Sequence, residues 1–347
     1  MCRGIKIVTV AALLILNSII AGVVFAGEQG HYSAMPLGVR DTAMPPVNGF
    51  FTAFFDMYYG SNTFKDRDAN KLGPISVSGT AQRDLTVLGQ SVPITITGNL
   101  NADIDVDLNM FMQLVAFIWK PDVKLLGADY AFMALPSWGY TRVDVKTKAN
   151  AAGTIQVGSR VNTISASMTS KIMDQDTGFG DLYVQPIWLN WKGKNYEIGG
   201  SYGLWCPTGY YDKDNIANVG YGFLTQQLQA TGYYYPFGKH TTALMLRPTW
   251  EWNTKKIDKD VQPGQVCTLE YGLAHSVHPR VELGLTGYNV WQVTEDQGSA
   301  AINKGVLDRV NGYGATVTFW VIPHKLSITG KFNQEYMAKD RFEGTAW

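Results

Sequence analysis

The feature that most constrains this chain is an alternation of apolar and polar residues, repeated in short runs from about Gly49 to the last residue. In one run, the residues of one parity are Ala243, Met245, Arg247, Thr249 and Glu251, and those of the other are Leu244, Leu246, Pro248, Trp250 and Trp252. Because successive side chains of a strand point to opposite faces, each run predicts a strand with a wetter face and an apolar face.

The first residues read as an export signal. Arg3 and Lys6 form a positive end, Ile7–Val24 an apolar stretch, and Val24-Phe25-Ala26 a small-x-small cleavage site. An uncleaved N-terminal anchor is the alternative. We therefore divide the chain into a signal peptide (1–26), an N-terminal periplasmic or plug segment (27–48) and a β-barrel (49–347).

Composition agrees with a barrel better than with membrane helices. A mean hydropathy of −0.08 is too polar for a helical membrane protein, and no run of 18 apolar residues follows the signal. In a barrel only alternate residues meet lipid, and the 10 Trp, 18 Tyr and 15 Phe suit aromatic girdles. The sequence predicts an all-β transmembrane antiparallel β-barrel of about 12 strands in the outer membrane of a Gram-negative bacterium.

Charge and cysteine content limit the partners. The signal carries two basic and no acidic residues, so the mature net charge is (29 − 2) − 29 = −2. That balance gives no reason to expect a nucleic-acid partner. Cys206 and Cys267 fall on the apolar parity of strands three apart, which predicts two buried thiols rather than a disulfide. We expect a monomer with membrane lipid and a small solute as partners, and no cofactor.

The connections between the predicted strands alternate between short turns and long polar loops, as in outer-membrane barrels. The two longest loops are predicted at 60–102, with hairpin extensions of its neighbours as an option, and at 146–177. Eleven strands are expected at about 49–59, 103–119, 123–136, 178–191, 196–207, 223–236, 241–252, 265–277, 281–293, 309–322 and 326–337. Only about 341–347 remains for a twelfth, which is short for a spanning strand.

Polar residues inside the strands are expected to face the lumen, because a charge facing lipid is costly. The pore-lining candidates are Asp107, Asn109, Gln113, Glu197, Gln227, Gln229, Arg247, Glu251, Glu270 and Glu282. Arg247 is expected to pair with an acidic residue across the lumen. The lipid-facing belt is expected to include Leu108, Met110, Met112, Leu114, Leu244, Leu246, Val317 and Phe319. Two interpretations stay open: a pore lining that sets selectivity, or a closed polar core whose charges satisfy one another.

Four motifs in order resemble an outer-membrane family named for the meta-pathway of phenol degradation. They are Gly30–Gly38 with Pro45–Phe50, Gly178–Pro186, Pro207–Tyr211 with Asn218–Gly220, and Asn333–Tyr336 with Arg341–Gly344. The resemblance spans nearly the whole mature chain. It implies an outer-membrane channel, often found beside genes for the breakdown of aromatic or other hydrophobic compounds, and it implies no enzyme.

Other motifs are weaker. Gly199-Gly200-Ser201-Tyr202-Gly203 matches a nucleophile elbow, but lies in a strand pattern rather than at a strand-to-helix turn. The histidines lack zinc-site spacing, and Asp66–Lys71 lacks the glycine of a calcium loop, so no catalytic or metal-binding residue is expected. The predicted function is passive uptake of small hydrophobic or aromatic compounds. An outer-membrane serine hydrolase acting on lipid, or a non-conducting structural or adhesion barrel, is the alternative.

Overall fold

The computed structural model describes residues 29–87, 90–237, 240–302, 304–322 and 325–347, so the predicted signal lies outside the described residues. The chain divides into two compact units. One contains Lys71–Val106 and Asp144–Met173, and the other contains Ala26–Asn70, Asp107–Val143 and Asp174–Trp347.

Across the described ranges, no helix has the length and apolar character needed to cross a membrane.

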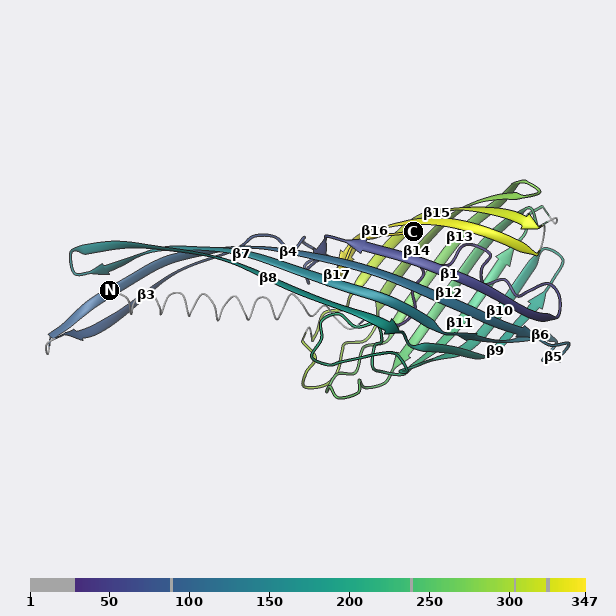
Figure 1. The fold of residues 1–347 in the computed structure, drawn as a ribbon, viewed down its shortest axis with the longest axis horizontal. Coiled ribbons are helices and arrows are strands. Elements are labelled where there is room, and N and C mark those ends of the chain that lie inside the picture. The colour runs from purple at the N-terminus through teal and green to yellow at the C-terminus, as the bar shows by residue number, and fades with distance from the viewer. Residues whose placement is uncertain (1–28, 88–89, 238–239, 303, 323–324) are drawn as a thin grey trace. The chain divides into compact units, whose positions relative to one another are not determined.

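The larger unit is a closed antiparallel barrel of 12 strands (Figure 1). Around the barrel the strands are β6 (Ala128–Leu135), β9 (Leu182–Lys192), β10 (Tyr196–Cys206), β11 (Thr225–Tyr234), β12 (Thr242–Asn253), β13 (Val266–His278), β14 (Val281–Gln292), β15 (Arg309–Ile322), β16 (Leu326–Lys339), β18 (Thr345–Ala346), β1 (Gly49–Ser61) and β4 (Gln90–Lys120). The barrel closes because β4 also pairs with β6, with Phe117 opposite Ala134. The fold predicted from the alternation is therefore confirmed.

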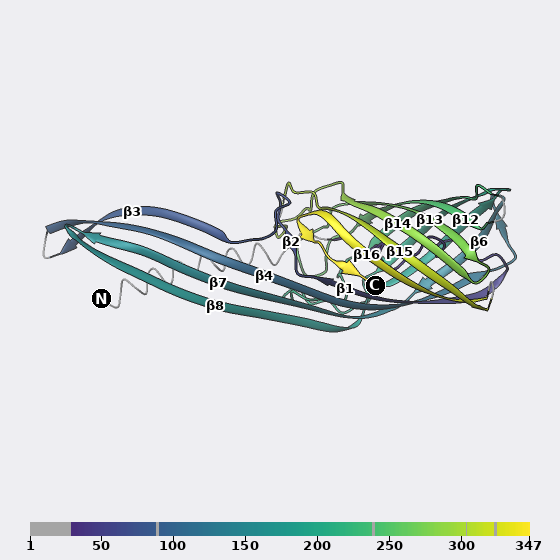
Figure 2. The same cartoon turned by 90° about the horizontal axis from the view of Figure 1, so that it is seen from above.

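The two ends of the barrel sequence meet through the short strand β18. Ala346 lies opposite both Asn333 of β16 and Tyr59 of β1, and Figure 2 shows the C-terminal end of the chain beside these strands. Two further short strands, β2 (Phe64–Lys65) and β17 (Arg341–Phe342), pair with each other. The little strand β5 (Lys124–Leu125) pairs with β6.

The smaller unit is a sheet rather than the pair of loops expected at 60–102 and 146–177. The strand β3 (Ile75–Val87) pairs with the first part of β4, and β7 (Ser137–Val157) and β8 (Arg160–Phe179) continue the sheet on the other side of β4. For 60–102 the structure contains the hairpin extension that the sequence left as an option. For 146–177 the loop prediction was wrong, because polar composition was weighted above β-branched content. Thr, Val and Ile alternate through these segments, and such residues favour strands even when half of them are polar.

The side chains of the barrel strands alternate as predicted in most of the wall. In β12, Met245 and Arg247 are buried, whereas Leu244 and Leu246 are exposed on the outside. Val317 and Phe319 of β15 are likewise exposed. Cys206 and Cys267 are free thiols, and both are half-buried rather than buried. The barrel thus has an apolar outer surface and an interior that holds many polar groups.

Candidate functional site

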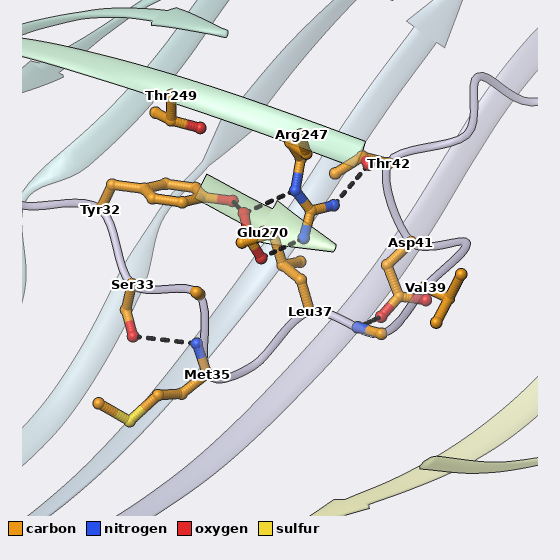
Figure 3. Close-up of polar contacts among 12 residues, drawn as sticks. Tyr32, Ser33, Met35, Leu37, Val39, Asp41, Thr42, Arg247, Thr249 and Glu270 are labelled. Atoms are coloured by element: carbon orange, nitrogen blue, oxygen red, sulfur yellow. Dashed lines mark hydrogen bonds and ion pairs between the residues drawn. The ribbon is translucent and has the colours of Figure 1, made fainter. Parts of the chain in front are cut away.

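The N-terminal segment, described from residue 29 to residue 48, is bound by side chains from the inner face of the barrel (Figure 3). The backbone N–H of Tyr32 donates to Glu251 Oε1 at 2.9 Å. Arg40 Nε donates to Glu282 Oε2 at 2.7 Å, and the Tyr233 hydroxyl donates to the carbonyl oxygen of Val39 at 2.9 Å. The segment forms no regular secondary structure, so these hydrogen bonds provide partners for backbone groups that a strand would otherwise pair.

One buried ion pair fastens both ends of the loop between Tyr32 and Thr42. Arg247 of β12 pairs with Glu270 of the neighbouring strand β13, and both side chains are buried. Arg247 also donates a hydrogen bond to Thr42 Oγ1 at 2.5 Å. Glu270 accepts a hydrogen bond from the hydroxyl group of Tyr32. Figure 3 shows Tyr32, Glu270, Arg247 and Thr42 joined in one chain of contacts.

The middle of the same loop is fastened through its carbonyl oxygens. Lys331 Nζ of β16 donates to the carbonyl oxygens of Ala34 at 3.1 Å and Leu37 at 2.5 Å. Asn333 Nδ2 donates to the carbonyl oxygen of Met35 at 3.0 Å. Donors from β11, β12 and β16 therefore surround the loop, and they contact it largely through backbone atoms.

His31 anchors the start of the segment in an aromatic pocket. Its Nδ1 lies 2.7 Å from Thr225 Oγ1 and its Nε2 lies 2.9 Å from Asp181 Oδ2. The ring stacks on Trp205 and meets the edge of Phe223. Burial lowers the pKa of His31 below its usual value, and the nearby Asp181 carboxylate only partly opposes this effect.

Asp181, which lies in the Gly178–Pro186 motif, also connects chain segments that lie apart in the sequence. Its carboxylate accepts the backbone N–H groups of Gly209 at 2.9 Å and Tyr221 at 2.8 Å. The chain segments approach so closely here that a Cβ on Gly209 would lie 2.7 Å from the backbone of Gly180, and one on Gly220 would lie 2.7 Å from the backbone of Gly209. Gly209 of the Pro207–Tyr211 motif and Gly220 of the Asn218–Gly220 motif are therefore required by contact between backbones.

Next to the segment, the barrel encloses a cavity of about 200 Å³. One wall is apolar and comes from β1, β4 and β6; its residues include Phe55, Met57, Met110, Met112, Leu114 and Met133. The facing wall is polar and comes from β9, β10 and β11; its residues include Tyr183, Gln185, Ser201, Gln227, Gln229 and Thr231. Residues of the N-terminal segment, Tyr32, Ser33, Pro36 and Leu37 among them, complete the lining.

The structure reverses the expected orientation of β4. Met110, Met112 and Leu114 were expected in lipid, but they line the cavity. The opposite parity, which holds Asp107, Asn109 and Gln113, therefore faces outward, where Gln113 is exposed. The expectation that these three residues face the lumen is wrong. Alternation gives a strand two different faces, but does not say which of them is inside.

The outward polar groups of β4 are satisfied across the strand pair with β1. Gln113 Nε2 donates to Asp56 Oδ1 at 2.9 Å, and the Tyr58 hydroxyl donates to Asn109 Oδ1 at 2.7 Å. Such cross-strand pairs lower the cost of polar groups on an apolar surface.

The other seven pore-lining candidates are all buried in the barrel. Gln227 and Gln229 line the cavity. Arg247, Glu251, Glu270 and Glu282 bind the N-terminal segment instead. Glu197 accepts hydrogen bonds from Asn190 and Tyr235, each at 3.1 Å.

Several contributors to the site were missed by sequence reasoning. His31, Thr42 and Asp181 lie in irregular segments, where periodicity gives no signal. Lys331 falls in a predicted strand but was not singled out. For His31 and Asp181 the only signal was their position inside the motifs Gly30–Gly38 and Gly178–Pro186.

Ser201 lies within β10 and lines the cavity, so the strand context expected for it is confirmed. His31 also lines the cavity, but its two ring nitrogens contact Asp181 and Thr225. No hydrogen bond joins Ser201 to a histidine among the residues that the structure describes. The same residues contain no group of three or more His, Cys, Asp or Glu placed to hold a metal ion.

Fold and site together define a membrane-type β-barrel with a binding cavity and an N-terminal segment inside it. The model of the family described as "Putative MetA-pathway of phenol degradation" matches residues 60–347. The chain belongs to that family. No curated protein sequence matches the chain.

One solved structure supports the fold. The chain is similar to the COG4313 outer membrane channel from Pseudomonas putida F1, with 14% identity and a TM-score of 0.56, over 89% of this chain and 96% of that one. A FadL homologue from Pseudomonas aeruginosa matches at 12% identity and a TM-score of 0.31, over 85% of this chain and 87% of that one. The first match shows that the fold is that of an outer-membrane channel-type barrel.

Proposed function

We propose that the protein is an outer-membrane channel for the passive uptake of small hydrophobic or aromatic compounds. The observation that carries the proposal is the cavity inside the barrel, whose apolar wall comes from three adjacent strands. An apolar surface inside an otherwise polar barrel has no role in membrane insertion, since that depends on the outer face. Its natural use is to contact an apolar solute.

The proposed outer-membrane location rests on the apolar outer surface of the barrel. The outer surface exposes residues such as Leu246, Leu285 and Ile328, and this apolar band suits contact with lipid. Together with the export signal expected at residues 1–26, it supports an outer-membrane location in a Gram-negative bacterium. The working unit in this proposal is a monomer. Solutes would move down their own gradient, because no site for an energy source is expected.

Of the two roles that the sequence left open for the N-terminal segment, periplasmic segment or plug, this proposal assigns it the role of a plug. It lines the cavity and is fixed by Glu251, Glu282 and the Arg247–Glu270 pair. For a solute to pass, the loop between Tyr32 and Thr42 would have to leave its position. The hydrogen bonds of this loop are mostly to side chains of the barrel, and water can replace them when the loop moves. Movement of a short loop costs far less than opening the barrel wall, where strands are joined by ladders of backbone bonds.

The firm attachment of this segment also favours a second function, a barrel that does not conduct. Such a protein would act as a structural or adhesion element. The serine hydrolase alternative receives less support, because the ring nitrogens of His31, the histidine in the cavity lining, contact Asp181 and Thr225 rather than Ser201.

The proposal is tested with vesicles whose outer leaflet is lipopolysaccharide, which slows the diffusion of apolar molecules. The refolded full chain should speed the uptake of radiolabelled toluene above the rate for vesicles holding heat-unfolded protein. The uptake rate of a sugar of similar size should increase much less. Equal toluene uptake with folded and unfolded protein would contradict a channel function and favour the non-conducting barrel.

A further inference from the structure

The cavity lining contains three hydroxyl groups that have no hydrogen-bond partner among the residues that the structure describes. They belong to Thr141, Ser201 and Thr231, and these residues are only 8%, 7% and 8% exposed. Ser201 and Thr231 lie together in the polar wall, whereas Thr141 comes from β7. Because these oxygens open onto the cavity, the hydroxyl group of a bound molecule can satisfy them in place of water.

Charge in the lining is one-sided. Among its described residues there is no Lys or Arg, whereas two carboxylates, Asp41 and Asp181, are present. Asp41 accepts the backbone N–H of Gly38 at 2.6 Å, and Asp181 contacts His31. The nearby cations Arg247 and Arg40 are paired with Glu270 and Glu282. An anion entering the cavity would lose hydration and find no cationic partner in the lining.

The two walls fit the two ends of one molecule. Ser201 and Thr231 lie on the adjacent strands β10 and β11, within the polar wall, and the methionine-rich wall provides a flexible apolar surface. A ligand that satisfies both walls has an apolar body and one uncharged hydroxyl group.

We infer that the cavity binds small neutral molecules that carry an apolar body and a hydroxyl group, and that it rejects carboxylates of the same shape. Ser201 and Thr231 bind the hydroxyl group, and Met110, Met112 and Met133 contact the body. This inference deepens the proposed channel function by naming the class of solute, and it rests on that function only for its biological use.

The test is equilibrium binding to the refolded full chain in detergent, measured by isothermal titration calorimetry with benzyl alcohol and with benzoate. The two probes share a ring and differ in the charge of the polar end. We expect saturable binding of benzyl alcohol, and binding of benzoate at least tenfold weaker. Benzoate binding as tight as that of the alcohol, or no saturable binding of the alcohol, would overturn the inference.

Variants assign the effect to this cavity. The double variant S201A/T231V keeps nearly the same volume, and we expect it to weaken benzyl alcohol binding about tenfold, because a site built around a hydroxyl group loses affinity when that bond is lost. Q229K adds a cation to the lining and should reverse the preference toward benzoate. T318V removes a hydroxyl from a half-buried strand position that is not part of the cavity lining, and it should bind as the wild type does. Unchanged binding in both cavity variants would contradict the assignment.

The outcome is separable from that of the channel proposal. If the protein speeds solute uptake but binds both probes equally, the inferred selectivity is contradicted and the channel function stands. If it binds the alcohol selectively but leaves vesicles no more permeable, the channel function is contradicted and the inferred selectivity stands. A heat-modifiable gel band verifies that every variant folds as a barrel.

Discussion

Tyr32 and Thr42 join the two ends of the N-terminal loop to one buried ion pair. The Tyr32 hydroxyl contacts Glu270 and the Thr42 hydroxyl accepts from Arg247. The Tyr32 N–H also donates to Glu251, and the Thr42 hydroxyl also contacts the Tyr233 hydroxyl. Removing either member of the ion pair would strand a buried charge and threaten folding. Substitutions of Tyr32 and Thr42 in the N-terminal segment leave the Arg247–Glu270 ion pair in place, so they do not leave a buried charge unpaired.

We therefore predict that Y32F/T42V loosens the plug and leaves the barrel intact. Each lost bond to a charged group is worth on the order of 1.5 kcal/mol, which together gives a roughly hundredfold faster amide exchange in the segment. Hydrogen–deuterium exchange of peptides from residues 29–48 measures this. S33A is the matched control, because the Ser33 hydroxyl contacts only Met35 within the segment. Equal exchange in the double variant and in S33A would contradict the attachment described here.

His31 adds a pH dependence to the same segment. Because burial lowers its pKa below the usual 6.5, the seated segment favours the neutral ring. Above about pH 6.5 both seated and released forms are neutral, and the seated form carries no penalty. As pH falls through and below that value, the released ring protonates first, so the stability of the seated form decreases.

We predict that exchange of the segment speeds up between pH 7.5 and pH 5, after correction for the intrinsic pH effect on exchange. Each unit by which the pKa is lowered is worth about 1.4 kcal/mol. The charges that act on the ring are those of Asp181 and Lys256, and of these Asp181 opposes the effect. H31Q should lose the dependence. A segment held more firmly at pH 5 than at pH 7.5 would contradict the assigned direction.

At the scale of the element, β4 shows both the reach and the limit of sequence reasoning. Its alternation predicts a strand, and the structure contains one. Its apolar face was placed in lipid because that is the usual environment of such a face in a barrel. The structure turns that face toward the cavity, where Met110, Met112 and Leu114 form part of an apolar wall. Local pattern cannot distinguish these two environments, because both are apolar.

This orientation predicts opposite effects at neighbouring positions of β4. M112Q places a polar group in the apolar wall and should slow toluene uptake into the vesicles by about tenfold. Q113M changes the outer face and should leave uptake unchanged. If Q113M slowed uptake and M112Q did not, the original lipid-facing assignment of Met112 would be right after all.

The sheet of the smaller unit shows a different limit. Segment 146–177 was interpreted as a loop because it is rich in Ser, Thr, Asn and Gly, and segment 60–102 because it is long and polar, with hairpin extensions left as an option. The cross-strand pairs of Ser76 with Asn101 and of Thr80 with Thr97 show how polar side chains satisfy one another on an exposed sheet. Composition underestimates strands of this kind, because their stability depends on pairing and not on burial.

At the scale of the whole molecule, the barrel was predictable from the sequence, whereas the contacts of the N-terminal segment inside it were predictable only in part. Arg247 was expected to pair with an acidic residue across the lumen; it does pair with an acidic residue, but this is Glu270, directly opposite on the neighbouring strand β13 and not across the lumen. The binding of Tyr32 and Thr42 to that pair could not be foreseen, because irregular segments have no period from which contacts can be derived. The N-terminal family motif gave the position of the segment in the sequence but not its contacts.

The central claim is that the lumen is a channel closed by the N-terminal segment. The most direct measurement is single-channel conductance in a planar bilayer, comparing the wild type with a variant that lacks residues 29–46. The account predicts a mostly closed wild type with rare brief openings, and a deletion variant that is open for most of the recording. Equal conductance in the two proteins, whether both are open or both are silent, would contradict it.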